Sequence, residues 1–180
     1  MKYVVLIPIY NDRESLKLVI ENINYEIKDL NHEISIVVIN DASSQQIVDT
    51  YPNIENINSI EIVNMKENRG HARCIATGLK YISEKKEFDF VIPMDGDGED
   101  RPKEIKNFIK LTEQSAEKSI VGERVKRSEG LIFKICYIFH KFLTLAFTGQ
   151  SIKFGNFTCL SKSTVKKMLE EKATWNSFSG

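Results

Sequence analysis

The stretch FVIPMDGDGEDRP, residues 90–102, changes within a few positions from an apolar run to alternating acid and glycine. Its apolar start is typical of a buried strand. Four carboxylates then follow within six residues: Asp95, Asp97, Glu99 and Asp100. Such close carboxylates repel one another unless a cation lies among them, and Gly96 and Gly98 allow a tight turn that brings Asp95 and Asp97 together. The stretch therefore predicts a divalent metal site that holds a phosphorylated ligand; the alternative is an acidic, solvated loop without a ligand.

The rest of the chain alternates between strand and helix patterns. Continuous apolar runs predict strands at 3–9, 34–39, 60–63, 88–94 and 119–122. Apolar residues at helical spacing predict helices at 16–30, at 72–82, from 102 onward and at 163–171. Before the last of these helices, a small ordered turn is expected at residues 154–157. The alternation predicts an α/β fold with a Rossmann-like, mainly parallel sheet flanked by helices and joined by right-handed crossovers.

Charged side chains follow three of the predicted strands. Asp41 comes just after the second, Asp95 after the fourth, and Arg124 and Arg127 after the fifth. Open α/β sheets bind ligands at the carboxyl ends of their strands, so we expect these side chains at one edge. Carboxylates, a hard cation and arginines suit a diphosphate, because the metal bridges phosphate oxygens and arginines pair with the others. Asp41 could instead cap a short helix over residues 45–50, and both alternatives stay open.

Length and composition describe an ordinary globular chain. At 180 residues it is long enough for one domain with a sizeable core. The 25 basic and 25 acidic residues cancel, which argues against nucleic acid as a partner. Cys74, Cys136 and Cys159 are far apart and lack metal-ligand spacing, so we expect buried thiols in a reducing compartment. We expect neither a signal peptide at the start nor a transmembrane helix.

Residues 131–148 form a strongly apolar segment with helical periodicity. Its polar residues fall three and four apart and occupy one narrow stripe, which leaves an apolar face wider than a core-facing helix needs. Lysines beside such a face suit a helix that lies in a membrane interface. Burial between the sheet and neighbouring helices explains the pattern equally well, and both alternatives stay open.

Several motifs together resemble the family 2 glycosyltransferases of the GT-A fold, over nearly the whole chain. VLIPIYND (5–12) matches the opening PxYNE-type motif, VVINDASS (37–44) the nucleotide-binding VDDxS motif, and MDGDGEDRP (94–102) carries the DxD motif. Within the family, the chain looks most like the polyprenyl-phosphate glycosyltransferases, the dolichol-phosphate-mannose synthase-like branch. GHAR (70–73), the Arg-containing segment after Gly122 and FGNF (154–157) point there.

The resemblance implies roles for particular residues. The nucleotide base and ribose would be contacted by Pro8, Tyr10, Asp12 and Asp41. Asp95 and Asp97 would hold Mg²⁺ or Mn²⁺ on the donor diphosphate, with Glu99 close behind. Arg124 and Arg127 would contact the donor diphosphate or the lipid phosphate.

The resemblance also implies the reaction and its partners. It predicts an inverting transferase that moves a sugar from a nucleotide-diphosphate donor to a polyprenyl-phosphate acceptor by a single displacement, through an oxocarbenium-like transition state. A lipid phosphate is already ionised and needs no strong general base. If the acceptor is instead a glycan or other hydroxyl, Glu99 or Asp100 is the candidate base. The third hypothesis is a non-catalytic nucleotide-sugar-binding fragment.

Two residues depart from the family motifs. Asn40 replaces the first Asp of VDDxS and so removes a charge, and Asn156 stands where many branch members carry Asp, so no base is assigned there. We expect residues 1–123 to form the nucleotide-sugar-binding core and residues 124–180 an acceptor-side segment, truncated relative to members that continue into membrane helices. The expected location is the cytoplasmic face of the membrane, as a peripheral protein.

Overall fold

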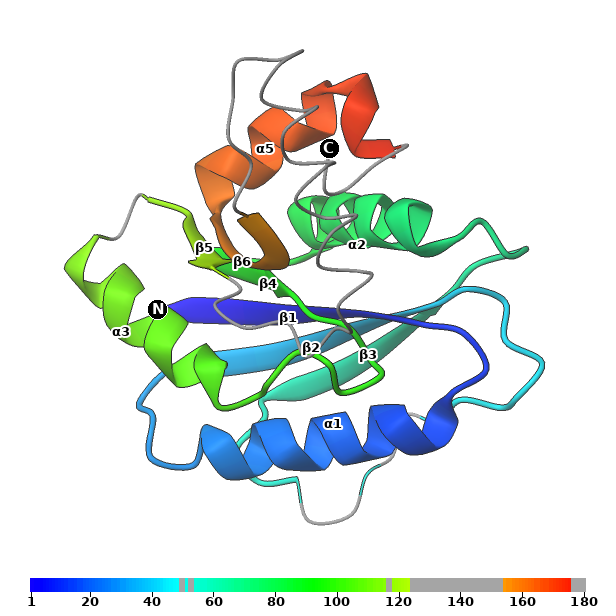
Figure 1. Ribbon diagram of the computed structural model, residues 1–180, viewed down its shortest axis with the longest axis horizontal. Helices are drawn as coiled ribbons and strands as arrows, with labels where there is room; N and C mark the ends of the chain where they lie inside the picture. Colours follow the sequence, from blue (N-terminus) through cyan, green and yellow to red (C-terminus); the bar gives the residue numbers. More distant parts are fainter. Residues whose placement is uncertain (49–50, 52–53, 116–117, 124–153, 176–180) are drawn as a thin grey trace, which may run out of the picture.

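In the part of the chain that the structure describes, the fold is a six-stranded sheet covered by helices on both faces (Figure 1). The computed structural model describes residues 1–48, 51, 54–115, 118–123 and 154–175. Its strands are β1 (Lys2–Ile9), β2 (Glu33–Asn40), β3 (Ser59–Asn64), β4 (Phe90–Pro93), β5 (Ile120–Glu123) and β6 (Phe154–Ser161). Its helices are α1 (Arg13–Glu26), α2 (His71–Lys85), α3 (Glu104–Gln114), α5 (Lys162–Glu170) and the 3₁₀ turn η1 (Lys172–Trp175).

The strand order is β3-β2-β1-β4-β6-β5, and the first four strands are parallel. At the centre, Val5 of β1 pairs with Ile36 of β2 on one side and with Ile92 of β4 on the other. β6 runs antiparallel to both of its neighbours, β4 and β5. The predicted mainly parallel sheet is therefore confirmed, with one antiparallel strand inserted near an edge.

The apolar strands follow from burial on both faces. Alternate residues of the central strands pack against α1 and α3 on one face and against α2 and α5 on the other, as the two layers in Figure 1 show. On β1, for example, Val5 and Ile7 belong to the first cluster and Val4 and Leu6 to the second. Strands buried in this way need no polar alternation, which is why they appear in the sequence as continuous apolar runs.

Local signals set the helix starts. The Asp12 side chain accepts a hydrogen bond from the Ser15 N–H at 3.2 Å and caps α1. The expected start of a helix at Pro102 is two residues too early, because residues 101–103 form a turn that precedes α3. In that turn the Glu104 N–H donates to the Arg101 carbonyl and the Ile105 N–H to the Pro102 carbonyl.

Two local predictions are wrong. Residues 154–157 are not a turn but the start of β6, where Phe154 pairs with Glu123 and the Phe157 ring packs edge-on against Phe108 at 4.9 Å. Residues 45–48 form no helix. They are held instead as a loop, in which the Gln45 side chain accepts a hydrogen bond from the Arg13 N–H at 3.2 Å.

Two of the three cysteines and five helical segments fall within the described residues. Cys74 and Cys159 are buried and free, as expected, and burial raises the pKa of each thiol to about 12. In the part of the chain that the structure describes, none of the helices has the length and apolarity to cross a bilayer. Cys136, Arg124, Arg127 and the segment 131–148 lie outside the described residues.

Candidate functional site

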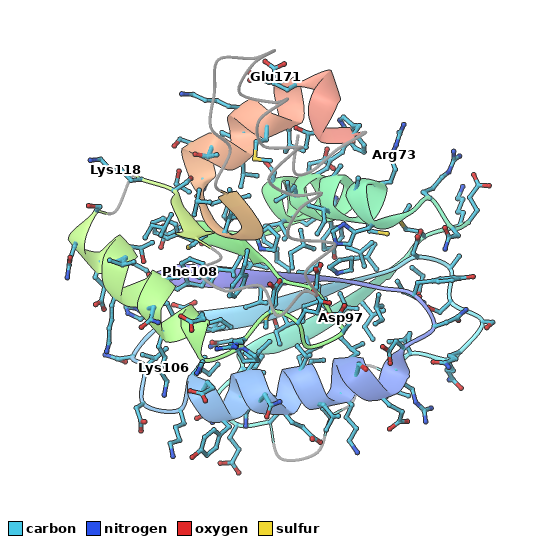
Figure 2. All side chains as sticks on the ribbon, in the orientation of Figure 1. Arg73, Asp97, Lys106, Phe108, Lys118 and Glu171 are labelled. Carbon is cyan, nitrogen blue, oxygen red and sulfur yellow. The ribbon has the colours of Figure 1, made fainter. Side chains whose placement is uncertain are left out.

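The carboxyl ends of β1, β2 and β4 meet at one edge of the sheet, because these three strands are parallel neighbours. The loops that leave them carry Tyr10, Asp41 and Asp95. Figure 2 labels Asp97 on the loop that leaves β4. The structure thus brings the sequence-predicted side chains of the described region to the edge at which open α/β sheets bind ligands.

The loops after β1 and β2 are joined through Asn11, which the sequence analysis did not select. Its side-chain oxygen accepts hydrogen bonds from the N–H and the hydroxyl of Ser44 at 2.8 and 3.0 Å, and its own N–H donates to the Ser43 hydroxyl at 2.9 Å. Asn11 and Ala42 both have positive φ, 53° and 57°. Such backbone is costly for a non-glycine residue and persists where surrounding bonds hold it. The two loops therefore form one fixed unit; the signal for Asn11 was its place in VLIPIYND.

Asp41 does not cap a helix after β2, so that alternative is wrong. The residue is only 3% exposed, and its two carboxylate oxygens accept the N–H groups of Arg69 and Gly70, both at 2.8 Å. Gly70 has φ of 82°, which favours glycine, and is the N-cap of α2. Asp41 therefore fixes the start of α2 to the end of β2. Its contact with a nucleotide stays a prediction.

The other predicted nucleotide-pocket residues lie around this unit. Tyr10 is 53% exposed at the edge and can contact a ligand. Pro8 lies within β1, where it pairs with Ile39. Asp12 uses its side chain to cap α1. The nucleotide contacts of these three residues stay predictions.

The acidic loop folds largely onto itself. The Asp100 carboxylate accepts the Asp95 N–H at 2.9 Å, and the Asp97 carboxylate accepts the Glu99 N–H at 2.9 Å. Gly98 has φ of 83°, which favours glycine, and a Cβ on Gly96 would lie 3.1 Å from the Pro8 carbonyl oxygen, so one glycine serves the turn and the other serves close packing. The loop is therefore a defined turn against the end of β1.

His71 is the second site residue that the sequence analysis missed. It opens α2, and its Nε2 lies 2.8 Å from Asp95 Oδ1. The hydrogen bond to Asp95 raises the pKa of His71, partial burial opposes this, and the charges of Asp95, Asp100 and Asp97 add to the rise. The only signal in the sequence was its place in GHAR, which named no partner.

The donor set of the loop fits a hard divalent cation. Within the described ranges, no three or more His, Cys, Asp or Glu side chains gather closely enough to enclose a metal ion. Mg²⁺, however, is commonly held by one or two carboxylates together with substrate phosphates and water. Asp95 and Asp97 supply such a pair beside open solvent, with side chains that are partly and largely exposed.

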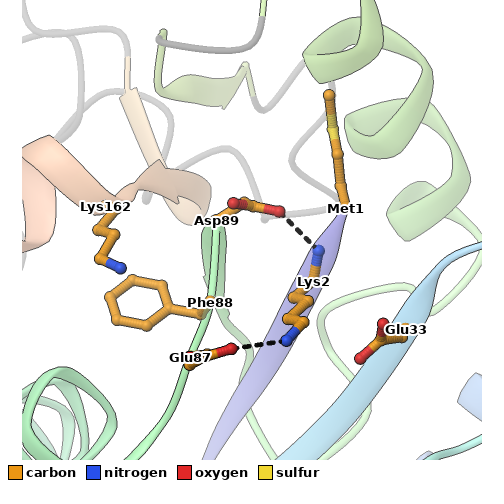
Figure 3. Close-up of a pocket in the computed structure, with 7 residues that line it drawn as sticks. All are labelled: Met1, Lys2, Glu33, Glu87, Phe88, Asp89 and Lys162. Carbon is orange, nitrogen blue, oxygen red and sulfur yellow. Dashed lines mark hydrogen bonds and ion pairs between the residues drawn. The ribbon is translucent and has the colours of Figure 1, made fainter.

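A shallow pocket of about 330 Å³ lies at the opposite, amino edge of the sheet (Figure 3). There the Lys2 N–H donates to Asp89 at 2.8 Å, and the Lys2 ammonium pairs with Glu87 at 2.8 Å. These bonds tie the start of β1 to the residues that precede β4. The pocket is therefore separate from the carboxyl-edge site, and three of its polar residues, Lys2, Glu87 and Asp89, are used in the fold.

This sheet, with helices on both faces and acidic side chains at its carboxyl edge, is of the GT-A class. The family model "Glycosyl transferase family 2" matches residues 4–164, and the chain belongs to that family. The structure is similar to S. aureus TarS 1-349 in complex with UDP-GlcNAc, with a TM-score of 0.51 and 21% identity over 74% of this chain and 38% of that one. At this identity the likeness shows the fold alone.

Curated relatives narrow the resemblance. The undecaprenyl-phosphate 4-deoxy-4-formamido-L-arabinose transferase of Photorhabdus laumondii is 28% identical over 173 residues, which cover 94% of this chain and 50% of the relative. The protein of the same name from Serratia proteamaculans is 26% identical over 172 residues, with the same coverage. The chain spans about half the length of the curated relatives it matches. The predicted resemblance to the polyprenyl-phosphate branch of family 2 is confirmed.

Proposed function

We propose that the chain is the donor-binding part of a glycosyltransferase that moves a sugar from a nucleotide-diphosphate donor to a polyprenyl phosphate. The observation that carries the proposal is the arrangement of Asp41, His71 and Asp95 at the carboxyl edge, within a family 2 fold. The names of the curated relatives support a polyprenyl-phosphate acceptor. Because these relatives match most of this chain, we assign the same class of acceptor to it.

The donor nucleotide would lie on the unit formed by the loops after β1 and β2. Because Asn11 already joins these loops, little ordering is required when the nucleotide binds, and preorganisation of this kind favours affinity. The exposed Tyr10 ring offers a surface for the base. Asp12 and Asp41 carry charge at the base of the same loops.

Asp95 and Asp97 would hold Mg²⁺ or Mn²⁺ beside the donor diphosphate. When bound, the cation neutralises charge on the departing nucleoside diphosphate. The bonds of the acidic loop hold the Asp95 backbone through the Asp100 carboxylate, and they hold the Asp97 carboxylate against the Glu99 N–H. Arg124 and Arg127 would contact the donor diphosphate or the lipid phosphate.

The proposed displacement is a single inverting step. The acceptor phosphate is ionised at neutral pH, so the chain need not supply a strong base. The proposed location is the cytoplasmic membrane surface, where residues 131–148 would present their apolar face to lipid.

Calorimetric titration tests the donor site. The wild-type chain would be titrated with UDP, GDP and CDP, each with and without Mn²⁺, and compared with Asp97→Ala and with Asp29→Ala, an exposed control after α1. We expect metal-dependent binding of one nucleotide, lost in Asp97→Ala and kept in Asp29→Ala. Absence of binding to all three nucleotides, or EDTA-sensitive binding that survives Asp97→Ala, would contradict the proposed site.

The acceptor is tested separately with the sugar nucleotides of the base that binds. Transfer to undecaprenyl phosphate in detergent would support the proposed acceptor. Transfer to a soluble glycan without need of lipid would instead show a hydroxyl acceptor.

A further inference from the structure

We propose that His71 is a positioning residue that holds the Asp95 carboxylate in the orientation needed for the cation and the donor diphosphate. The inference rests on the proposed function and adds a residue from α2 to a site otherwise built from strand ends. Three groups of contacts at the carboxyl edge support it.

The first contact is between His71 and Asp95 themselves. Nε2 of His71 lies 2.8 Å from Oδ1 of Asp95, and the two side chains are 49% and 36% exposed. This hydrogen bond engages one carboxylate oxygen and directs the other away from the imidazole. Carboxylates that bind metals are commonly oriented by such a partner, and loss of the partner typically lowers metal affinity about 10- to 100-fold.

The second set of contacts fixes the Asp95 backbone but not its side chain. The Asp95 N–H is held by the Asp100 carboxylate at 2.9 Å, and the next residue, Gly96, packs against the Pro8 carbonyl. With the main chain held, the orientation of the carboxylate depends on rotation about its side-chain bonds. The hydrogen bond from His71 selects one of these rotamers.

The third set of contacts fixes His71. Arg69 and Gly70 directly precede His71, and the Asp41 carboxylate accepts the N–H group of each at 2.8 Å. The Gly70 carbonyl in turn accepts the Cys74 N–H in the first turn of α2. His71 is therefore attached to a buried carboxylate at the end of β2, and it connects that strand end to the acidic loop after β4.

The test compares His71→Ala and His71→Gln with His32→Ala. His32 is a matched control, because its Nε2 lies 2.9 Å from Glu113 Oε1, far from the carboxyl edge. For each variant, Mn²⁺ binding would be measured by electron paramagnetic resonance, alone and with the nucleotide that binds the wild-type chain. We expect His71→Ala to lower Mn²⁺ affinity about 10- to 100-fold. We expect His71→Gln, whose amide can donate to Asp95, to recover most of it, and His32→Ala to match the wild type.

A second measurement separates positioning from general damage. In the Asp95→Ala background, His71→Ala should cause no further loss of Mn²⁺ or nucleotide affinity, because its effect passes through Asp95. Unchanged or tighter Mn²⁺ binding in His71→Ala, a His71→Gln variant as weak as His71→Ala, or a further loss in the Asp95→Ala background would each overturn the inference. A wild-type chain that binds no Mn²⁺–nucleotide would overturn the proposed function as well, and that outcome is visible before any variant is made.

Discussion

Asp41 and Gly70 are joined by a 2.8 Å hydrogen bond from the Gly70 N–H to the Asp41 carboxylate, so the end of β2 and the start of α2 are fixed to each other. The other oxygen of the same buried carboxylate accepts the Arg69 N–H. The sequence suggested that Asp41 contacts a nucleotide or caps a local helix. In the structure it holds together β2 and α2, through a bond to a residue 29 positions further along the chain.

Replacement of Asp41 by Ala should lower stability. The change removes two partly buried hydrogen bonds, from the N–H groups of Arg69 and Gly70 to the carboxylate, and a hydrogen bond to a charged group contributes about 1.5–3 kcal/mol. Urea unfolding would measure the loss, with Asp89→Ala as control, because the Asp89 carboxylate accepts the exposed N–H of Lys2 at the opposite edge of the sheet. Nucleotide affinity should also fall, with or without metal. An Asp41→Ala chain as stable as the wild type would contradict the anchoring role.

Asn11 offers a test of preorganisation in the loops after β1 and β2. Asn11→Ala removes the acceptor of Ser44 and places alanine at φ of 53°, whereas Asn11→Gly removes the same acceptor without the backbone cost. We expect both variants to bind nucleotide more weakly and Asn11→Ala to be the less stable, by about 1 kcal/mol. Calorimetry and thermal unfolding measure the two effects. Equal nucleotide affinity in both variants and the wild type would show that the loop bonds do not support binding.

Glu61 predicts a pH dependence of stability. Hydrogen bonds from Lys86 and, at 3.0 Å, from the Tyr81 hydroxyl lower the pKa of Glu61, with the Lys86 bond as the largest cause. A lowered pKa means that the stabilisation is present above the pKa of an unfolded Glu and is lost as pH falls through the folded value. Glu61→Gln should therefore be less stable than the wild type at pH 7, with a difference that shrinks below about pH 4.

Glu84→Gln is the matched control for Glu61, since Glu84 forms a 3.9 Å surface pair with Lys80 and exposed pairs of this kind contribute little to stability. Its unfolding free energy should follow that of the wild type across the pH range. A Glu61→Gln deficit of the same size at pH 3 and pH 7 would show that lost packing, not charge, is responsible.

The segment 131–148 carries a prediction about membranes. Replacement of Phe139 and Phe142 by Ser should release the chain from anionic vesicles while the fold stays intact, if the apolar face meets lipid. Vesicle sedimentation and circular dichroism together measure both properties. Unfolding of the double variant would instead assign the segment to the protein core.

The sequence was most informative where the cause of structure is local. The apolar run of β1 and the amphipathic pattern of α1 both follow from neighbouring residues, and both elements were predicted. The start of β6 was missed because Gly155 and Asn156 suggest a turn, whereas pairing with distant β5 makes it a strand.

The same distinction between local and long-range causes applies to the residues of the candidate site. The acidic loop and Asp41 could be found because a strand end followed by carboxylates is visible in the sequence. The partner of Asp95 could not, because His71 is 24 residues away and meets it only when α2 is packed on the sheet. Asn11 was likewise hidden, since its contacts with Ser43 and Ser44 depend on the parallel pairing of β1 and β2.

The position of β6 between β4 and β5 has a consequence for synthesis on the ribosome. Both neighbours emerge before β6, yet neither can pair with it until residues 154–161 have left the exit tunnel. Until then, the β4 side of the growing sheet presents unpaired backbone groups, and an open strand edge is a site for pairing with other chains. Completion of the sheet is thus a long-range event that waits until both neighbours of β6 have been synthesised.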